Sequence, residues 1–454
     1  MKNVYNNILE CVGNTPLVRL NSLTKGLKCT VYAKVEFFNP AGSIKDRVAK
    51  QIIEDYEAEG KIKKGGMIVE GTSGNTGAGL ALMAATRGYQ STFVMPDKQS
   101  EEKRSALRAW GSKVVITPTN VDADDPRSYY KVSERLVTEN ENACYANQYH
   151  NPSNPKAHYL STGPELWDQL DGKIDVFIAG VGTGGTIAGT GKYLKEQNKD
   201  VQVVGVDPVG SLYYDYFYSG IMTKPYTYVL EGIGEDFMPS TMNFDCVDDV
   251  VRVNDKECFE MTRRLVREEG IFAGASCGAA IAGALKYLRK HDREGMTAVI
   301  ILPDNAKNYL SKVFNDKWME ENGFFEPDIH TGTVADILKK KGKSKLLTLD
   351  QGTSIVDSIS FMKKHGISQV PVTQDGKLIG ILNETTLRKI VQSGKKANDI
   401  SLLVDLDFCV VHNDTEVYVL KDLFDRYKVA LVFNEKNEMS NIITQIDFLD
   451  FMAQ

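Results

Sequence analysis

The stretch AGVGTGGTIAGTG, residues 179–191, places a short apolar strand directly before a glycine-rich turn and a helix of small residues. Glycine lets the backbone of such a turn close around an anion, and the N–H groups that start the next helix favour negative charge. The turn does not end in Lys-Ser or Lys-Thr, so it is not a Walker loop. The acidic residue that a dinucleotide site needs about 20 residues later would have to be Asp200 or Asp207. The stretch therefore favours a phosphate site without a nucleotide, and close packing of a helix on a strand is the alternative.

Residues 1 to about 320 repeat this pattern of strand, turn and helix. Apolar strands are expected at 67–70, 91–95, 113–117, 175–179, 201–206 and 298–302, with helices at 77–87, 102–110 and 187–197 between them. Strands joined by crossover helices imply a mostly parallel sheet that binds ligands at the carboxyl ends of its strands. The sequence thus predicts an α/β fold for this part of the chain.

Composition and charge exclude several classes of protein. The 454 residues leave room for two or three domains, and a net charge of -6 gives no basic footprint for nucleic acid. No apolar run reaches the roughly 18 residues that span a bilayer, and the first residues lack the apolar core of a signal peptide. The seven cysteines are scattered without a CxxC pair. This usage is typical of reduced thiols in the cytoplasm and not of disulfides or a zinc site.

The pattern of the chain changes after a helix expected at 316–322. Residues 323–332 contain Pro and Gly and are expected to form a linker, so the catalytic region would span 1–322. The remainder contains two weakly similar halves, at 333–395 and 396–454. Each half is expected to form a helix, a strand, a turn, a strand and a helix, and such a repeat predicts a pair of small α+β domains.

Lys45 occupies an unusual place for a lysine. In FFNPAGSIKDRVAK, residues 37–50, Ser43 is expected to cap a helix, so that Lys45 falls in its first turn. The exposed N–H groups there disfavour a cation. This dipole and burial both lower the pKa of a lysine, and a neutral amine can act as a nucleophile and a base. An exposed surface lysine is the alternative.

Two more turns rich in glycine and hydroxyl groups precede helices. EGTSGNTGAGLA, residues 70–81, suits a carboxylate or phosphate, although a plain capped turn explains it too. FAGASCGAA, residues 272–280, places Ser276 at a helix start, where it could be a simple N-cap. Taken with Lys45 and the turn at 182–186, these are the parts that pyridoxal phosphate needs: an amine, a phosphate cradle and a partner for the ring nitrogen.

Several motifs resemble those of one enzyme family. CVGNTPLVRL, NPAGSIKDR, EGTSGNTG, GTGGTIAGTG and GVDP resemble fold-type II pyridoxal-phosphate enzymes, the cysteine synthase and cystathionine β-synthase group, over about residues 6–320. QYHNPSNPKAHY and EGIGEDFMP shift the resemblance toward the cystathionine β-synthase branch, and residues 333–454 resemble the paired CBS repeats of a Bateman module. The resemblance implies two open, mostly parallel α/β sheets followed by an α+β CBS pair.

The resemblance also implies roles for individual residues. Lys45 would bind the cofactor covalently, Asn75 would hydrogen-bond its phenolic oxygen and Ser276 its ring nitrogen. The cofactor phosphate would rest on Gly182, Thr183, Gly184, Gly185 and Thr186. The substrate carboxylate would be held by Thr72, Ser73, Asn75, Thr76 and Gln148, with Gly232 in a mobile EGIG loop that helps to close the site.

The implied reaction replaces the β-substituent of an amino acid. Serine and homocysteine would give cystathionine and water, in transsulfuration and cysteine biosynthesis, with release of hydrogen sulfide from cysteine as a side activity. O-acetylserine sulfhydrylase, a cysteine synthase, is the alternative. The two reactions differ in the leaving group of the first substrate, since acetate leaves more easily than hydroxide. A regulatory protein that senses nucleotides with its CBS pair and does not catalyse is an alternative of another class, and the intact Lys45 argues against it.

The chain departs from the animal members of the group in three ways. No haem segment precedes the catalytic region, no CxxC stands before GVDP, and Glu235 follows EGIG where Tyr is expected. Haem is therefore expected to be absent. Because Glu235 stands where Tyr is expected, the sequence does not predict which residues contact the second substrate.

The C-terminal repeats carry one candidate effector site. Thr444 and Asp447 have the spacing that such modules use for ribose, which predicts an adenosine-containing effector such as S-adenosylmethionine. A plain helix-start charge is the alternative for Asp447. The family further suggests a homodimer or homotetramer, and neither nucleic acid nor a membrane is expected as a partner.

Overall fold

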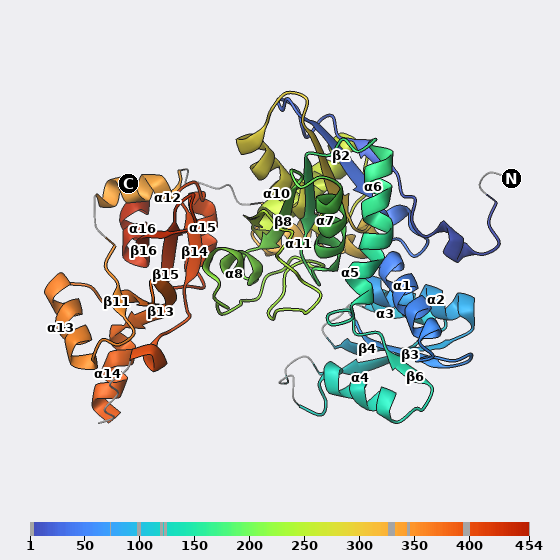
Figure 1. Ribbon diagram of the computed structural model, residues 1–454, viewed down its shortest axis with the longest axis horizontal. Coiled ribbons are helices and arrows are strands. Elements are labelled where there is room, and N and C mark those ends of the chain that lie inside the picture. Colours follow the sequence, from blue (N-terminus) through green and yellow to red (C-terminus); the bar gives the residue numbers. More distant parts are fainter. Residues whose placement is uncertain are drawn as a thin grey trace. The chain divides into compact units, whose positions relative to one another are not determined.

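The computed structural model describes residues 4–72, 74–97, 101–118, 121, 125–325, 332–342, 346–393 and 400–453. The chain divides into two compact units, which Figure 1 shows as ribbons. The first unit comprises Met1–Pro208, Val229–Gly234 and Met238–Phe325. The second unit comprises Val209–Tyr228, Glu235–Phe237 and Glu326–Gln454. Two short segments from the middle of the chain therefore pack with the C-terminal repeats, and the EGIG loop lies between them in sequence.

The larger sheet of the first unit has the strand order β1-β2-β10-β7-β8-β9. Only β1 is antiparallel to its neighbour. The strands β7, β8 and β10 are almost completely buried and nearly continuous in apolar residues, because helices α7 and α10 pack against the sheet. The elements are β1 (Leu17–Arg19), β2 (Thr30–Val35), β7 (Val176–Gly180), α7 (Gly185–Gln197), β8 (Gln202–Pro208), β9 (Asp249–Val253), α9 (Asp255–Glu269), α10 (Ala275–His291) and β10 (Thr297–Leu302).

The smaller sheet of the first unit has the order β5-β4-β3-β6 and is parallel throughout. Its elements are β3 (Met67–Gly71), α2 (Asn75–Arg87), β4 (Gln90–Pro96), α3 (Glu101–Ala109), β5 (Lys113–Thr117), α4 (Tyr129–Thr138) and β6 (Ala143–Tyr145). In Figure 1, α1 (Lys45–Ala58) and α2 lie on one side of these strands and α4 on the other. Val48, Ile52 and Ile53 recur at helical spacing and are fully buried, so they fix α1 in the core of this half.

Shorter elements complete the first unit. They are α5 (Ser153–Ala157), the π-helical turn η3 (His158–Thr162), α6 (Gly163–Gln169), α11 (Asp316–Glu321) and the 3₁₀ turns η1 (Ile8–Cys11), η2 (Glu36–Phe38) and η4 (Ala306–Tyr309). No helix of the described chain combines the length and apolar character needed to cross a membrane.

The two sheets confirm the predicted fold class. The predicted strand at 113–117 has the observed bounds, and the other five differ by at most two residues at either end. The prediction that Ser43 caps the first long helix agrees with its hydrogen bond to the Lys45 N–H, although α1 is assigned from Lys45 with Ile44 before it. Ile44 is already helical, at φ -58° and ψ -21°, and Ser43 pairs with Asp304 in an isolated β-bridge. The Ser43 Oγ still accepts a hydrogen bond from the Lys45 N–H, at 3.2 Å.

The second unit contains two three-stranded sheets, β11-β12-β13 and β14-β15-β16. The expected order of helix, two strands and helix occurs twice, and most of the predicted linker lies outside the described residues. The elements are α12 (Val334–Lys341), β11 (Leu349–Asp350), α13 (Ile355–His365), β12 (Gln369–Gln374), β13 (Lys377–Asn383), α14 (Glu384–Ser393), η5 (Ile400–Leu403), β14 (Cys409–His412), α15 (Val417–Phe424), β15 (Val429–Phe433), β16 (Met439–Thr444) and α16 (Gln445–Met452).

The segment Val209–Tyr228 contributes to the core of the second unit. Its helix α8 (Tyr213–Ser219) packs against β14, and Val209 joins the hydrophobic cluster around Val334 and Val411. The buried carboxylate of Asp215 accepts a hydrogen bond from the Val410 N–H at 2.7 Å. The segment is therefore joined to the C-terminal repeats by both apolar and polar contacts.

Candidate active site

Three long helices of the first unit begin at a glycine without a capping side chain. A helix start of this kind leaves backbone N–H groups and the positive end of the helix dipole available to an anion. The contrast is α9, where Asn254 and Glu257 form a complete capping box. The uncapped starts belong to α2, α7 and α10, whose N-cap residues are Gly74, Gly184 and Gly274.

The glycine turn before α7 has no room for side chains. A Cβ on Gly185 would lie 2.0 Å from the Asn154 Oδ1, and a Cβ on Gly184 would lie 2.6 Å from Met242. Gly184 also has a φ of +80°, which other residue types rarely adopt. The bare backbone followed by an uncapped helix suits a phosphate group, so the residues present fit the predicted cofactor.

The EGIG loop lies against this turn. A Cβ on Gly182 would be 3.0 Å from the Gly232 carbonyl oxygen, and a Cβ on Gly232 would be 3.5 Å from the Ser276 Oγ. The Gly234 N–H donates to the Val181 carbonyl oxygen at 2.7 Å. The predicted phosphate turn, the predicted closing loop and the predicted partner of the ring nitrogen are thus neighbours in space.

Glu231 ties the same loop to two other parts of the first unit. Its carboxylate forms ion pairs with Lys103 of α3 and with Lys312. Burial alone would raise the pKa of Glu231, but these two lysines lower it, so that it stays ionised. A Cβ on Gly74 would lie 3.9 Å from the Lys103 side chain. Lys103 therefore lies beside the turn that precedes α2.

The residues predicted to hold a substrate carboxylate are connected to the phosphate turn. Thr76 donates a hydrogen bond from Oγ1 to the Gln148 Oε1 at 2.6 Å, and both side chains are buried. The Asn154 Nδ2 donates to the Gln148 carbonyl oxygen at 2.8 Å and to the Thr183 Oγ1 at 2.9 Å. Asn154 therefore joins the two predicted anion sites, although sequence reasoning did not select it.

Two further members of the predicted carboxylate site belong to the turn after β3. The Thr72 Oγ1 accepts a hydrogen bond from the Gly74 N–H at 3.3 Å. Ser73 lies outside the described residues. Glu70, at the end of β3, accepts hydrogen bonds from the backbone N–H groups of Asn147 and Gln148 at 2.6 and 3.3 Å. Glu70 thus fixes the backbone that carries the Gln148 side chain.

Asp304 is central to the site and was missed by sequence reasoning. Its Oδ2 accepts hydrogen bonds from the Asn75 Nδ2 at 2.8 Å and from the Tyr309 hydroxyl at 2.7 Å, and the residue is 1% exposed. Burial raises the pKa of Asp304, while hydrogen bonds from Tyr309 and Asn75 and the charges of Lys103 and Lys45 lower it. A polar residue just after a buried parallel strand was the signal that could have revealed it.

The Asp304 carboxylate determines how Asn75 is oriented. The Asn75 Nδ2 donates to the Asp304 Oδ2, so the amide nitrogen of Asn75 faces this carboxyl group. The Asn75 Oδ1 accepts a weaker hydrogen bond from the Asn308 Nδ2 at 3.4 Å. One N–H of Asn75 then remains for a ligand, and it can donate to an anionic oxygen.

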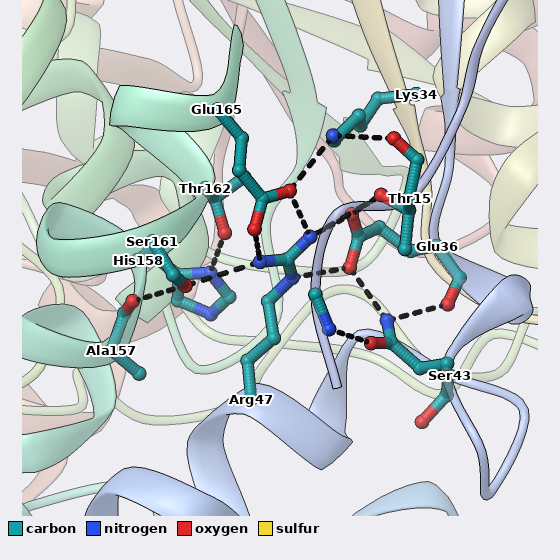
Figure 2. Close-up of polar contacts among 12 residues, drawn as sticks. Thr15, Lys34, Glu36, Ser43, Arg47, Ala157, His158, Ser161, Thr162 and Glu165 are labelled. Carbon is teal, nitrogen blue, oxygen red and sulfur yellow. Dashed lines mark hydrogen bonds and ion pairs between the residues drawn. The ribbon is translucent and has the colours of Figure 1, made fainter. Parts of the chain in front are cut away.

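A buried ion-pair network supports the start of α1. Figure 2 shows Arg47 between Glu36 and Glu165, with Lys34 bound to the same Glu165 carboxylate. Arg47 lies 2.7 Å from the Glu36 Oε2 and 2.6 Å from the Glu165 Oε1, and Lys34 lies 2.9 Å from the Glu165 Oε2. Because two cations face two carboxylates, charge is balanced where water is excluded. The network joins α1 to β2 and α6, two residues from Lys45.

The predicted effector residues lie in the second unit. Thr444 caps α16, and the Asp447 Oδ2 accepts hydrogen bonds from the Thr444 N–H and hydroxyl, each at 2.8 Å. The Lys341 ammonium of α12 also lies 2.8 Å from the Asp447 Oδ2. The carboxylate therefore has both a helix-capping role and a cationic partner. Glu235, also in this unit, donates its backbone N–H to the Ser211 Oγ at 3.0 Å.

Comparison with known proteins identifies the class of the chain. The sequence profile of the family described as pyridoxal-phosphate dependent enzyme matches residues 8–304, and the profile of the CBS domain matches residues 334–393. The two parallel sheets, the lysine at the start of α1 and the glycine turn before α7 agree with this match. The protein is a pyridoxal-phosphate-dependent enzyme with a C-terminal CBS region.

Relatives of full length define the family more closely. Cystathionine beta-synthase of Dictyostelium discoideum is 37% identical over 470 residues, covering 100% of this chain and 93% of that protein. The protein of the same name from Saccharomyces cerevisiae is 36% identical, covering 96% of this chain and 91% of that protein. The chain belongs to the cystathionine β-synthase family.

Other relatives match about two thirds of the chain. Cysteine synthase of Staphylococcus aureus is 42% identical over 306 residues, covering 67% of this chain and 95% of that protein. The crystal structure of a hydrogen sulfide-producing enzyme from Fusobacterium nucleatum superposes with a TM-score of 0.63 at 34% identity, covering 68% of this chain and 99% of that one. The catalytic fold is thus shared with enzymes that carry other names.

Proposed function

We propose that the protein condenses L-serine with L-homocysteine to give L-cystathionine and water, with pyridoxal phosphate as cofactor. The observation that carries the proposal is the place of Lys45, in the first turn of α1 and in electrostatic interaction with Asp304. Relatives of the cystathionine β-synthase family that match the whole chain support the choice of reaction. The reaction serves transsulfuration and cysteine biosynthesis.

Each group of proposed cofactor residues binds a different part of the cofactor. The backbone N–H groups of Gly182, Thr183, Gly184, Gly185 and Thr186 hold the phosphate, Asn75 donates to the phenolic oxygen, and the Ser276 hydroxyl faces the ring nitrogen. When bound, the cofactor supplies an aldehyde that links to amines and a ring that withdraws electrons from the substrate Cα. Lys45 would hold the cofactor through its side-chain amine, and the free amine would take the substrate Cα proton as a general base.

The proposed substrate residues fix the amino acid for this proton transfer. Thr72, Asn75, Thr76 and Gln148 hold the carboxylate, and Ser73 is assigned to the same role from the sequence. Overall, the bond from Cβ to the serine hydroxyl would break, the bond from Cβ to the homocysteine sulfur would form, and the thiol proton would leave with the hydroxyl as water. Gly232 and its loop exclude water while the reactive Cβ is exposed, because water would compete with the thiol.

The direct test is covalent trapping at Lys45. Protein prepared with pyridoxal phosphate is treated with borohydride and digested, and mass spectrometry should find the cofactor on the peptide that contains Lys45. The control is Lys50→Ala, on the same helix, where the lysine is an exposed partner of Glu54. Lys45→Ala should abolish labelling and activity, whereas Lys50→Ala should keep both. Labelling at another lysine would contradict the proposal.

Product analysis separates the proposed reaction from the cysteine synthase alternative. The Staphylococcus aureus relative keeps that alternative open, because it matches 67% of this chain at 42% identity. With serine and homocysteine, cystathionine should form, and with O-acetylserine and sulfide, cysteine should form more slowly. The reverse ranking would favour cysteine synthase. Absence of both products would favour a regulatory protein without catalysis. Hydrogen sulfide from cysteine is expected as a side reaction.

We infer that the second CBS repeat binds an adenosine-containing effector through Thr444 and Asp447. The CBS profile matches the first repeat, and support for the second repeat comes from the position of both residues at the start of α16. The ribose hydroxyls would compete with Lys341 for the Asp447 carboxylate, so Lys341 would turn to an anionic group of the ligand. Unfolding temperatures with S-adenosylmethionine and with adenine nucleotides test this, and no shift with any of them would refute it.

The proposal places the enzyme in the cytoplasm as a homodimer or homotetramer and without haem. The seven cysteines support a reducing compartment, since all are free thiols. Light scattering measures the oligomeric state. The absorbance spectrum of the purified protein tests the haem statement, because a Soret band would contradict it.

A further inference from the structure

His158 lies directly behind the phosphate turn and is fully buried. Its Nδ1 is 2.9 Å from the Thr162 Oγ1, and its Nε2 is 3.2 Å from the Thr186 Oγ1. Figure 2 shows the ring with Thr162 at the π-helical turn that His158 begins. Such turns are rare in helices and are frequent at functional sites. The imidazole thus joins a π-helical turn to the last residue of the proposed phosphate cradle.

The position of the ring is fixed by close packing of α7 on this turn. A Cβ on Gly189 would lie 2.0 Å from the Pro155 carbonyl oxygen and 3.0 Å from the His158 Cβ. The helix can approach only because residue 189 is glycine. His158 therefore cannot move away from Thr186 without a shift of the whole helix.

The hydrogen-bond partners leave one consistent arrangement of protons. A phosphate oxygen only accepts hydrogen bonds, so the Thr186 hydroxyl must donate to it. The Thr186 Oγ1 is then an acceptor for the ring, and the His158 Nε2 must carry a proton. The Nδ1 of a neutral ring has no proton and accepts from the Thr162 hydroxyl. In the opposite tautomer Nδ1 carries the proton and Nε2 accepts one. The Thr186 hydroxyl would then donate to Nε2, and no hydroxyl proton would remain for the phosphate.

The surroundings keep the ring neutral. Burial lowers the pKa of His158 well below its usual value, the charges of Lys45 and Arg47 lower it further, and Glu165 acts in the opposite direction. A neutral imidazole has one donor and one acceptor nitrogen, which is what the two threonines require.

We propose that His158 is a positioning residue for the cofactor phosphate: its Nε2–H donates to Thr186, which aims the Thr186 hydroxyl proton at the phosphate, while the Thr162 hydroxyl donates to Nδ1. The inference rests on the proposed cofactor site and is independent of the substrate. It assigns His158 no contact with substrate or with the reacting atoms.

Two substitutions separate this role from simple packing. In His158→Gln the side-chain amide can reach the place of Nε2 and still donate to Thr186. In His158→Asn the amide reaches only as far as Nδ1, so the contact with Thr162 can persist but the donor to Thr186 is lost. His158→Asn should weaken binding of pyridoxal phosphate and of inorganic phosphate to the apoenzyme about tenfold, the value of one hydrogen bond. His158→Gln should stay within about threefold of the wild type.

A double-mutant cycle tests the coupling to Thr186. In a Thr186→Val protein, His158→Asn should have little further effect on phosphate binding, because the hydroxyl it orients is gone. The ³¹P signal of the bound cofactor should move in His158→Asn and not in His158→Gln. Equal weakening by both substitutions, wild-type affinity in His158→Asn, or independent effects of His158→Asn and Thr186→Val would each overturn the inference.

A measurement on the wild type does not depend on whether the variants fold. In apoenzyme labelled with ¹⁵N-histidine, one pair of ring signals should respond to added inorganic phosphate and show a neutral ring protonated at Nε2. A ring protonated at Nδ1, or no histidine response to a phosphate that binds, would overturn the inference. Failure of the wild type to bind pyridoxal phosphate at all would instead refute the proposed function.

Discussion

The Asn75 Nδ2 donates a hydrogen bond to the Asp304 Oδ2 over 2.8 Å, and this contact joins residues that are 229 positions apart. Asn75 begins α2 directly after a strand of the smaller sheet, and Asp304 follows β10 of the larger sheet. The bond therefore links the two sheets of the first unit where the carboxyl ends of their strands meet. It also sets the direction of the amide that is proposed to meet the cofactor.

Removal of the Asp304 charge should release Asn75. In Asp304→Asn the new amide presents one acceptor where the carboxylate has two, so the Asn75 orientation is no longer enforced. A charge-assisted hydrogen bond contributes about 1.5–3 kcal/mol, which corresponds to a loss of about 10- to 100-fold in kcat/KM. Steady-state kinetics with serine and homocysteine measures the loss. Tyr309→Phe is the control, since it removes the other donor to the same oxygen and leaves the Asn75 contact in place. Equal losses in both variants would contradict a specific role for Asn75.

The glycine at 185 should not tolerate a methyl group. The added Cβ would lie 2.0 Å from the Asn154 Oδ1 and would displace the amide that donates to Thr183. We expect Gly185→Ala to weaken pyridoxal-phosphate binding by at least tenfold, as measured by cofactor titration of the apoenzyme. Gly191→Ala, on the same helix, is the matched control, because its Cβ would come no nearer than 3.0 Å to the side chains of Cys246 and Val203. Normal cofactor affinity in Gly185→Ala would show that the turn can relax.

Glu165 should make stability depend on acid pH. Burial alone would raise its pKa, but the hydrogen bond and charge of Arg47 and the charge of Lys34 lower it from 4.5 to about 2. The folded state therefore binds the proton more weakly than the unfolded state does. The stabilisation by Glu165 is complete above about pH 4.5 and is lost as the pH falls toward 2.

The matching substitution is Glu165→Gln. It should lower the free energy of unfolding at pH 7 by about 3 kcal/mol. The difference in this free energy between the variant and the wild type should become smaller below pH 4.5. Urea unfolding between pH 7 and pH 3 measures this. Glu139→Gln removes an exposed carboxylate whose pair with Arg135 is 3.8 Å long, and it should change little at any pH. A Glu165→Gln difference that stays constant with pH would contradict the assignment.

Asp215 should stabilise the second unit although it belongs to the middle of the chain. Its carboxylate accepts hydrogen bonds from the Val410 N–H at 2.7 Å and from the Thr223 hydroxyl at 3.2 Å. Asp215→Ala deprives a buried N–H of this acceptor and should destabilise the second unit by about 1–3 kcal/mol. Hydrogen exchange should be faster at Val410 and in β14. Thr223→Val removes the longer contact and should have a smaller effect. Unchanged exchange in Asp215→Ala would show that α8 does not support β14.

Much of the fold could be predicted from local pattern. Short apolar runs between glycine turns predicted the parallel strands, and their bounds differ from the structure by two residues at most. At the start of α1, Ser43 was expected as the N-cap, and its Oγ accepts a hydrogen bond from the Lys45 N–H. Ser43 also pairs with Asp304, a residue distant in sequence, and a local rule cannot include such a partner.

Some residues of the candidate site could be predicted from the sequence and others could not. Lys45 and the glycine turn could be recognised because backbone chemistry at a helix start leaves a local signature in the sequence. Asp304, Asn154 and His158 could not be recognised in this way, because each acts through side chains from other segments. The roles proposed for all of these residues stay predictions until the cofactor and variant experiments are done.

The sequence alone determined that this chain forms parallel strands with anion-binding turns, because strand burial and glycine geometry depend on neighbouring residues. Only the tertiary structure decided which polar groups meet at those turns. It brings Asp304 to Asn75 and His158 to Thr186, and it gives the segment Val209–Tyr228 to the second unit. These pairings depend on how separate strands and helices pack, and burial makes each of them obligatory, since a polar group without water needs a partner.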